Sequence, residues 1–246
     1  MELRVLSYNI HRAIGVDRLF RPERIAEILA HHDADVVLLQ EVDVGVPRSR
    51  ELNLAEVLAE RLGYAHHAVG LNVKLRKGMY GNATLSRFPI VRERNIDLTI
   101  EDRKKRGCLF TELVLPGENG DQSLHVFNLH LGLSFKERPQ QVGILVRTPE
   151  FVELDLSSPC LVAGDFNDWW TRLAPIFTEA LSFGCATNHA VGYQNSLLTY
   201  PSFSPTTGLD KIFYRGPLTA QGGRRCRLNL SKVASDHLPV IAEFLL

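Results

Sequence analysis

Short apolar runs alternate along the chain with segments of helical period, which is the pattern of an α/β protein. The run at residues 35–42 predicts a buried strand, whereas residues 22–32 show helical spacing with Pro22 in the first turn. The middle of the chain predicts an antiparallel run of strands. Predicted strands cover residues 3–10, 35–42, 64–70, 82–86, 90–98, 107–115, 123–129, 160–164, 209–214, 225–230 and 240–246. Predicted helices cover residues 22–32, 52–62 and 136–154.

The chain repeats one arrangement in its two halves. In each half an Asn-x-His ends one strand, a helix follows, and an acid ends the next strand. The first copy spans residues 6–41 and the second spans residues 126–165. Two such halves would pack sheet against sheet with helices outside, as a layered α/β sandwich whose polar strand ends meet along one edge. A chance repeat is the alternative.

Polar side chains follow two apolar strands where core packing does not favour them. Glu41 comes after an apolar run, and Asp165, Asn167 and Asp168 crowd together after another. Buried carboxylates are costly unless a cation or hydrogen bonds meet them, and crowded ones repel. Oxygen ligands of this kind suit Mg²⁺ or Mn²⁺. Asn9 also ends a strand, and its alternative role is that of a turn former.

A histidine and two acids precede the last predicted strands. Asp236 and His237 stand just before residues 240–246, and Asp210 lies about two dozen residues earlier. A carboxylate beside a histidine fixes its tautomer and raises its basicity, which lets the ring take a proton from water. With the acidic strand ends, these residues supply the parts needed for metal-assisted hydrolysis.

Composition limits the choice of fold and partner. The chain has 246 residues, of which 45% are hydrophobic, so we expect a single domain over residues 1–246. Lysine plus arginine equals aspartate plus glutamate at 28 each, which argues against a tight, sequence-indifferent nucleic-acid binder. Basic runs at residues 74–77 and 103–106 are either substrate contacts or solvated loops.

Cysteine spacing and hydropathy indicate where the protein works. The four cysteines are scattered without a spacing that suits zinc. No run has the length of a membrane span, and the N-terminus lacks the features of a secretory signal. We therefore expect a cytoplasmic monomer with reduced thiols and no transmembrane segment.

Seven sequence blocks, in order, resemble the endonuclease/exonuclease/phosphatase superfamily, which includes deoxyribonuclease I. The resemblance runs from residue 3 to residue 245 and implies a four-layered α/β sandwich of two packed mixed sheets flanked by helices, with a Mg²⁺ or Mn²⁺ cofactor. The blocks are Tyr8-Asn9-Ile10, Leu39-Gln40-Glu41-Val42, Gly81-Asn82-Ala83-Thr84-Leu85-Ser86, Asn128-Leu129-His130-Leu131, Gly164-Asp165-Phe166-Asn167, Leu209-Asp210-Lys211-Ile212 and Ser235-Asp236-His237-Leu238-Pro239.

The resemblance implies a role for each matched residue. Glu41 is similar to the family's main metal ligand, with Asn9 and Asp236 beside the metal. His237 resembles the general base and Asp210 its orienting acid. The family's water-orienting and phosphate-contacting pair matches Asp165 and Asn167.

Three further residues are expected to contact the phosphate. His130 resembles the family's second histidine. Because abasic-site endonucleases have a tyrosine at that position, the histidine argues against abasic-site activity in this chain. Arg106 resembles a phosphate-binding arginine, a role that suits a bidentate guanidinium. Deoxyribonuclease I has a glutamate to orient its second histidine, and this chain has Asn82 in that place. We therefore expect His130 to act as an orienting or charge-stabilising group and not as a second base.

The sequence predicts a phosphoesterase that uses water, a divalent metal and a His/Asp pair. The resemblance extends most closely to small bacterial metal-dependent hydrolases, through Tyr200-Pro201-Ser202 and Lys105-Arg106-Gly107. A lipid-derived or small nucleotide phosphodiester is the expected substrate. A nuclease is the alternative, and a non-catalytic binding module is a third hypothesis. Trp169 and Trp170 either line a substrate pocket or pack under a loop.

Overall fold

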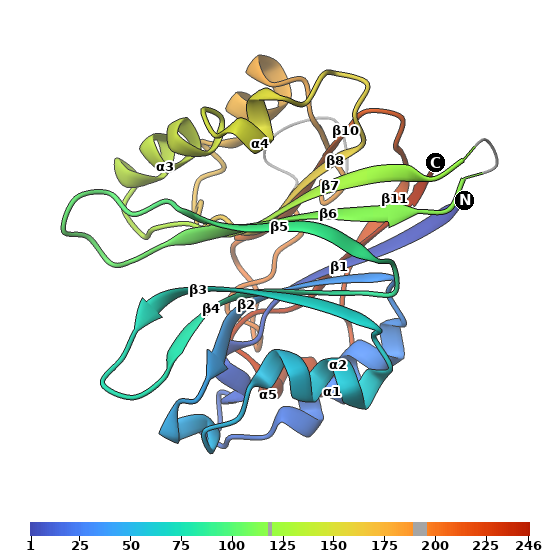
Figure 1. The fold of residues 1–246 in the computed structure, drawn as a ribbon. Helices are drawn as coiled ribbons and strands as arrows, with labels where there is room; N and C mark the ends of the chain where they lie inside the picture. Colours follow the sequence, from blue (N-terminus) through green and yellow to red (C-terminus); the bar gives the residue numbers. More distant parts are fainter. Residues whose placement is uncertain (118–119, 189–195) are drawn as a thin grey trace.

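The protein is built of four layers, helices, sheet, sheet and helices, as Figure 1 shows. This computed structural model describes residues 1–117, 120–188 and 196–246. Helices α1 (Pro22–His32), α2 (Leu54–Leu62) and α5 (Ser231–Ala234) cover the outer face of one sheet, and α3 (Glu137–Leu145) and α4 (Pro149–Val152) cover the outer face of the other. The expected four-layered sandwich is confirmed. Among the described residues, no helix is long and apolar enough to span a membrane.

The first sheet joins the two ends of the chain. Its strand order is β11-β12-β1-β2-β4-β3, with β1 parallel to β2 and antiparallel to β12. Its elements are β1 (Glu2–Asn9), α1 (Pro22–His32), β2 (Val36–Val44), α2 (Leu54–Leu62), β3 (His66–Lys74), β4 (Met79–Ser86), β11 (Thr219–Arg225), α5 (Ser231–Ala234) and β12 (Val240–Leu245).

The second sheet is formed by the middle of the chain. Its order is β5-β6-β7-β8-β10-β9, and β7 pairs parallel with β8 as β1 does with β2. Its elements are β5 (Ile90–Asp97), β6 (Gly107–Leu115), β7 (Gln122–His130), α3 (Glu137–Leu145), α4 (Pro149–Val152), β8 (Cys160–Asp165), β9 (Gly184–Cys185) and β10 (Asp210–Arg215). The repeated arrangement in the sequence therefore corresponds to the two parallel strand pairs.

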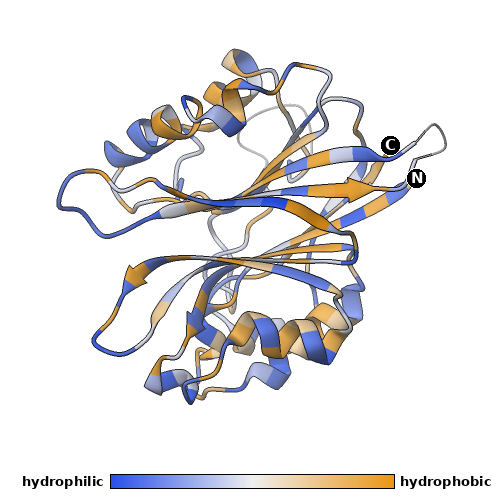
Figure 2. Ribbon diagram, in the orientation of Figure 1, coloured by the Kyte–Doolittle hydropathy of each residue, from blue (hydrophilic) through white to orange (hydrophobic). Residues whose placement is uncertain are grey.

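Apolar side chains fill three layers, one between the sheets and one under each set of helices. The hydrophobic residues in Figure 2 lie mainly along the strands and the inner faces of the helices. Burial of this extent is the main term that stabilises such a fold.

Three buried amide side chains join the sheets near the edge where the site lies. The Asn128 amide nitrogen donates to the carbonyl oxygens of Leu39, at 3.1 Å, and Ala83, at 2.9 Å, in the first sheet. Gln40 Nε2 donates to Asn128 Oδ1 at 2.7 Å. In the opposite direction, Asn82 Nδ2 donates to backbone carbonyls of the second sheet, including that of Asn128, at 3.0 Å. These bonds fix the relative positions of the sheets, because a buried amide left without partners is costly.

Two sequence predictions are wrong. The strand expected at residues 225–230 lies instead at residues 219–225, as β11. Glycines at 222 and 223 interrupt the alternation of apolar and polar residues that would have indicated it. A Cβ at Gly223 would lie 1.8 Å from the carbonyl oxygen of Ala186. The apolar residues at 228 and 230 pack against the core outside any strand. The helix expected at residues 136–154 is two helices, α3 and α4, because Pro149 starts a new one.

Candidate active site

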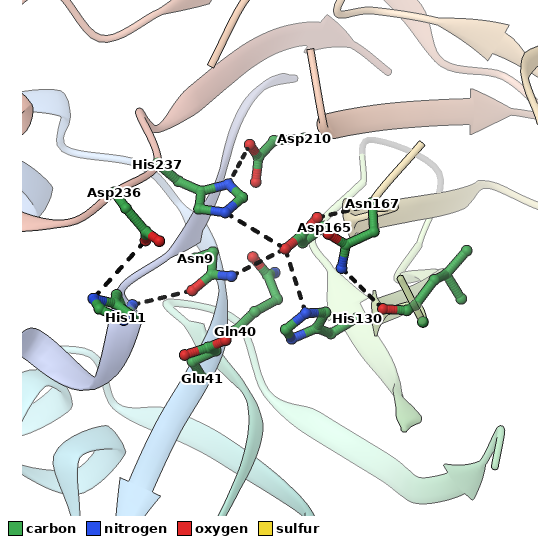
Figure 3. Close-up of polar contacts among 12 residues, drawn as sticks. Asn9, His11, Gln40, Glu41, His130, Asp165, Asn167, Asp210, Asp236 and His237 are labelled. Carbon is green, nitrogen blue, oxygen red and sulfur yellow. Dashed lines mark hydrogen bonds and ion pairs between the residues drawn. The ribbon is translucent and has the colours of Figure 1, made fainter. Parts of the chain in front are cut away.

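Polar residues from both sheets meet at the carboxyl ends of the two parallel strand pairs, as Figure 3 shows. β1 ends at Asn9, which pairs with Gln40 of β2, and β7 ends at His130, which pairs with Asp165 of β8. Asn9 Nδ2 donates to Asp165 Oδ2 at 3.0 Å, which brings the two pairs together. The expected convergence of strand ends is observed.

Glu41 reaches this edge through a β-bulge. Between Leu39 and Val42, β2 has one residue more than the segment of β4 that pairs with it. Glu41 lies in this bulge and adopts a left-handed backbone with φ of 56°. Such a conformation costs about 1–3 kcal/mol for a residue other than glycine, and bulges next to active sites redirect side chains. The strain at Glu41 therefore marks this carboxylate as a functional candidate.

Asp165 is the centre of the polar cluster. Its Oδ2 accepts the bond from Asn9 and lies 3.4 Å from His130 Nε2 and 3.7 Å from His237 Nε2. Its Oδ1 accepts from the backbone nitrogen of Asn167 at 2.9 Å. Burial raises the pKa of Asp165 to about 6, although the charge of His237 opposes the shift. This carboxylate can therefore exchange a proton near neutral pH.

His237 and Asp210 form a buried pair. His237 Nδ1 lies 2.8 Å from Asp210 Oδ2, which leaves Nε2 facing Asp165. Burial disfavours the imidazolium, but the negative charges of Asp210 and Asp165 outweigh burial and raise the pKa of His237 to about 10. The pair is thus arranged to hold a proton that His237 has taken up.

Thr199 holds the carboxylate of this pair, although no sequence pattern indicated it. Its hydroxyl donates to Asp210 Oδ2 at 2.5 Å and accepts from the Leu209 nitrogen at 3.3 Å. Its carbonyl accepts from the nitrogen of Leu238, next to the catalytic histidine candidate, at 2.9 Å. Thr199 therefore links the segment that carries His237 to the start of β10.

His130 differs from His237 in its charge state. Burial, aided by the positive charge of Arg106, lowers the pKa of His130 well below its ordinary value. His130 is therefore neutral at pH 7 and can donate or accept a hydrogen bond. Within the described part of the chain, the buried Arg106 Nε has no hydrogen-bond partner, so this guanidinium is free to bind an anion.

Asn82 lines a small recess with Arg106 and His130, but its amide nitrogen is occupied. Nδ2 donates to the backbone carbonyls of Gly107 and Asn128, each at 3.0 Å. In the described residues Asn82 makes no hydrogen bond to His130. Its observed contacts join the sheets, and its phosphate contact stays a prediction.

Asp236 lies on the other side of Asn9. Its carboxylate is one-third exposed and lies 3.9 Å from His11 Nδ1, while the His11 backbone nitrogen donates to Asn9 Oδ1 at 3.0 Å. The Ser235 hydroxyl donates to the carbonyl of Asn9 at 2.7 Å, which joins this segment to the end of β1. Asn9, Asp236 and the neighbouring His11 thus form one wall of the site (Figure 3).

The predicted metal ligands fit a hard divalent cation. Asn9, Glu41 and Asp236 offer amide and carboxylate oxygens, the atoms that Mg²⁺ and Mn²⁺ prefer. Glu41 Oε2 is buried without a hydrogen bond among the described residues and lies 3.2 Å from Arg12 Nε. Arg12, which the sequence did not indicate, thus supplies the positive charge beside this carboxylate.

A second set of possible ligand atoms lies deeper. Atoms of Asp165, Asp210 and His237 lie within 4.8 Å of one another. Hydrogen bonds account for this group, because His237 bonds to Asp210 and Asp165 accepts from Asn9. The predicted set around Glu41 is therefore the better candidate for a cation.

Comparisons with known proteins identify the family of this chain. Residues 6–237 match the model of the Endonuclease/Exonuclease/phosphatase family. "Uncharacterized protein YbhP" of Escherichia coli K12 is 32% identical over 251 residues, covering 98% of this chain and 95% of that protein.

Solved structures share the fold. An endonuclease/exonuclease/phosphatase from Beutenbergia cavernae has a TM-score of 0.79 at 23% identity, covering 100% of this chain and 72% of its own. The mannosyl-6-phosphatase of Bacteroides thetaiotaomicron has a TM-score of 0.75 at 20% identity, covering 99% and 100%. A humanized D. rerio TDP2 has a TM-score of 0.76 at 19% identity, covering 100% and 99%.

Proposed function

Because the chain belongs to the endonuclease/exonuclease/phosphatase family, whose members hydrolyse phosphoesters, we propose that it is a divalent-metal-dependent phosphodiesterase. The observation that carries the proposal is the convergence of the buried His237–Asp210 pair on Asp165, beside the strained Glu41. A binding module that had lost the chemistry would have no need of a buried, charged His–Asp pair, which is costly to maintain.

In the proposed reaction, water attacks phosphorus in line with the departing ester oxygen. His237 acts in its neutral form, which a bound cation would favour by offsetting the carboxylate charges that raise the pKa of this ring. Its Nε2 then takes a proton from the water, and Asp210 stabilises the resulting imidazolium through Nδ1. Asp165 and Asn167 orient the water. The ester P–O bond then breaks, and the leaving oxygen receives a proton from solvent.

Charge on the phosphoryl oxygens is met by neutral His130 and by Arg106, whose Nε is unpaired in the described residues. Losing one such preorganised donor typically costs on the order of a hundredfold in rate. Asn9, Glu41 and Asp236 would hold the cation. When bound, it would polarise a phosphoryl oxygen, favour ionisation of the attacking water and offset the carboxylate charge around His237.

A lipid-derived or small nucleotide diester is the proposed substrate class, in a cytoplasmic monomer. Free cysteines support the cytoplasmic location. The second candidate is a nuclease. It is favoured by the β3–β4 and β5–β6 hairpin tips, which carry basic residues at 74–77 and 103–105 and lie at the edge where β1 and β7 end.

The test is a panel of phosphodiesters and phosphomonoesters with Mg²⁺, Mn²⁺ or chelator, including plasmid DNA, single strands, phospholipids and nitrophenyl esters. We expect metal-dependent cleavage of diesters, and His237→Ala should lower kcat by roughly 10²–10⁴-fold. The exposed His67, replaced by alanine, is the matched control and should retain wild-type turnover. Cleavage confined to nucleic acid would favour the nuclease, and no metal-dependent cleavage would refute an enzymatic role.

A further inference from the structure

Large apolar side chains are exposed on three loops that border the site. The loop after His130 carries Leu133, 65% exposed, and Phe135, 52% exposed. The loop after Asp165 carries Trp169 and Trp170, 42% and 69% exposed. Phe203, 65% exposed, follows the segment whose Thr199 binds Asp210. Scattered surface hydrophobics are ordinary, but a group of them around one site indicates a binding surface. We call these five residues the apolar rim.

Ring contacts connect the rim to the catalytic histidine. The Tyr200 ring lies 5.1 Å from that of His237, and the Trp169 ring lies 5.4 Å from that of Tyr200. Further out, the Arg172 guanidinium lies 5.8 Å from both the Trp170 and Phe135 rings. The exposed rings therefore belong to the wall of the site and not to a distant face.

A buried ion pair holds two of the rim loops in place. Arg138 is 2% exposed, and its guanidinium donates to the carbonyl of Leu133 at 2.8 Å. The same guanidinium lies 3.8 Å from Asp168, whose other oxygen accepts from the nitrogen of Leu173 at 2.7 Å. Asn167 Nδ2 also donates to the carbonyl of Leu131 at 3.0 Å. The rim is thus presented by a fixed scaffold.

Cations accompany the exposed rings. Arg172 contacts two of them, and the Lys136 ammonium lies 5.9 Å from the Phe135 ring. The basic β3–β4 and β5–β6 hairpin tips lie at the same edge and are coloured as hydrophilic in Figure 2. Aromatic rings with cations beside them match the boundary of a bilayer, where rings enter the headgroup region and cations meet lipid phosphates.

We propose that the apolar rim docks on an anionic lipid bilayer and holds the site over phosphoesters at its surface. This inference rests on the proposed hydrolase function for its substrate but not for its binding step. The aliphatic Leu133 favours a lipid surface over nucleic acid, because it cannot stack on a base as an aromatic ring can. Because the net charge of the chain is zero, an anionic partner would be selected by local positive surface such as this one and not by the charge of the whole molecule.

The chain contains a direct reporter of the rim. Its two tryptophans are Trp169 and Trp170, so tryptophan fluorescence, excited selectively over that of the tyrosines, comes from the rim alone. Full-length protein in chelator, where hydrolysis is blocked, is titrated with vesicles of phosphatidylcholine or of phosphatidylcholine with phosphatidylglycerol. We expect a blue shift with the anionic vesicles. Since each nearby Lys or Arg contributes roughly fivefold, binding to neutral vesicles should be weaker by at least about that factor.

Variants separate the rim from other exposed apolar residues. The double change Phe135→Ala and Trp170→Ala should weaken binding to anionic vesicles by on the order of tenfold or more, with Trp169 as the remaining reporter. The matched control is Val152→Ala with Leu156→Ala, two side chains that are each 67% exposed and precede β8 at the opposite edge. The control should bind as the wild type does.

The outcomes are decisive for docking independently of catalysis. No fluorescence change with either vesicle, or equal loss of binding in the rim variant and the control, would overturn the proposal. A change with single-stranded oligonucleotide but not with vesicles would assign the rim to nucleic acid instead. If vesicles bind but no phosphodiester is cleaved with Mg²⁺ or Mn²⁺, the docking surface stands and the proposed hydrolase function fails.

Discussion

Replacing Thr199 by valine tests whether catalysis depends on the orientation of Asp210, because His237 and Asp210 are both still present in this variant. Valine keeps the shape of threonine but loses the hydroxyl that donates to Asp210 Oδ2 at 2.5 Å. Within the described residues, Asp210 Oδ1 has no partner, so Oδ2 carries the bonds that orient this carboxylate. Without Thr199, only His237 would hold it in place.

The size of the effect follows from the charge on the acceptor. A hydrogen bond to a charged group contributes about 1.5–3 kcal/mol, which corresponds to roughly 10- to 150-fold in rate if it acts entirely on the transition state. We expect kcat of Thr199→Val to fall within this range while KM changes little, because Thr199 does not face the substrate. Steady-state kinetics on a soluble phosphodiester measure both constants.

Thr199→Ser is the matched control, because it retains the hydroxyl and should restore kcat to within about threefold of wild type. Thermal unfolding of both variants shows how much of the loss comes from stability. If the valine variant turns over as fast as wild type, or if serine fails to rescue it, Thr199 does not position Asp210.

Three other perturbations test the metal site, the sheet interface and a buried histidine. Glu41→Gln should raise the Mg²⁺ concentration for half-maximal activity about tenfold or more, since a charged ligand is lost, and an unchanged metal titration would exclude Glu41 as a ligand. Asn128→Leu removes three hydrogen bonds between the sheets and should lower the free energy of unfolding by about 3 kcal/mol, against less than about 0.5 kcal/mol for the exposed Asn229→Leu. Burial, with lesser effects of nearby positive charges, lowers the pKa of His32 to about 4, so protonation favours the unfolded chain, and stability should fall as the pH drops from about 6.5 toward 4, by about 2 kcal/mol at pH 5. His32→Leu should flatten this pH dependence in chemical denaturation, and an unchanged slope would contradict the assignment.

Periodicity alone located most of the sheets. Residues 107–115 form β6 with the predicted bounds, because a mostly apolar run of strand length between turns leaves little choice of structure. The repeated Asn-x-His and acid predicted two similar halves packed sheet against sheet, and in the structure each copy corresponds to one parallel strand pair. Strand β11 was displaced in the prediction because its glycines carry no apolar pattern, and the close approach of Ala186 explains the glycine at position 223.

The candidate site could be predicted only in part. Strand-end acids such as Glu41 and Asp165 can be recognised in the sequence because core packing does not explain a carboxylate at the end of an apolar strand. The structure brings both of them to one edge of the sandwich. Thr199 and Arg12 could not be found in this way, since a threonine in a loop and an arginine after a strand are ordinary in sequence. Their contacts depend on tertiary geometry that local patterns do not contain.

The pairing of the first strand with the last has a consequence for biosynthesis. β1 lies beside β12, and Asn9 and His237 are contributed from near opposite ends of the chain. A ribosome-bound nascent chain can therefore form most of the second sheet while its catalytic centre is still missing its histidine. Activity should arise only after the segment that carries His237 emerges. Turnover of a soluble substrate would therefore be measured only for chains that contain this segment and have paired β12 with β1, and not for stalled or truncated products.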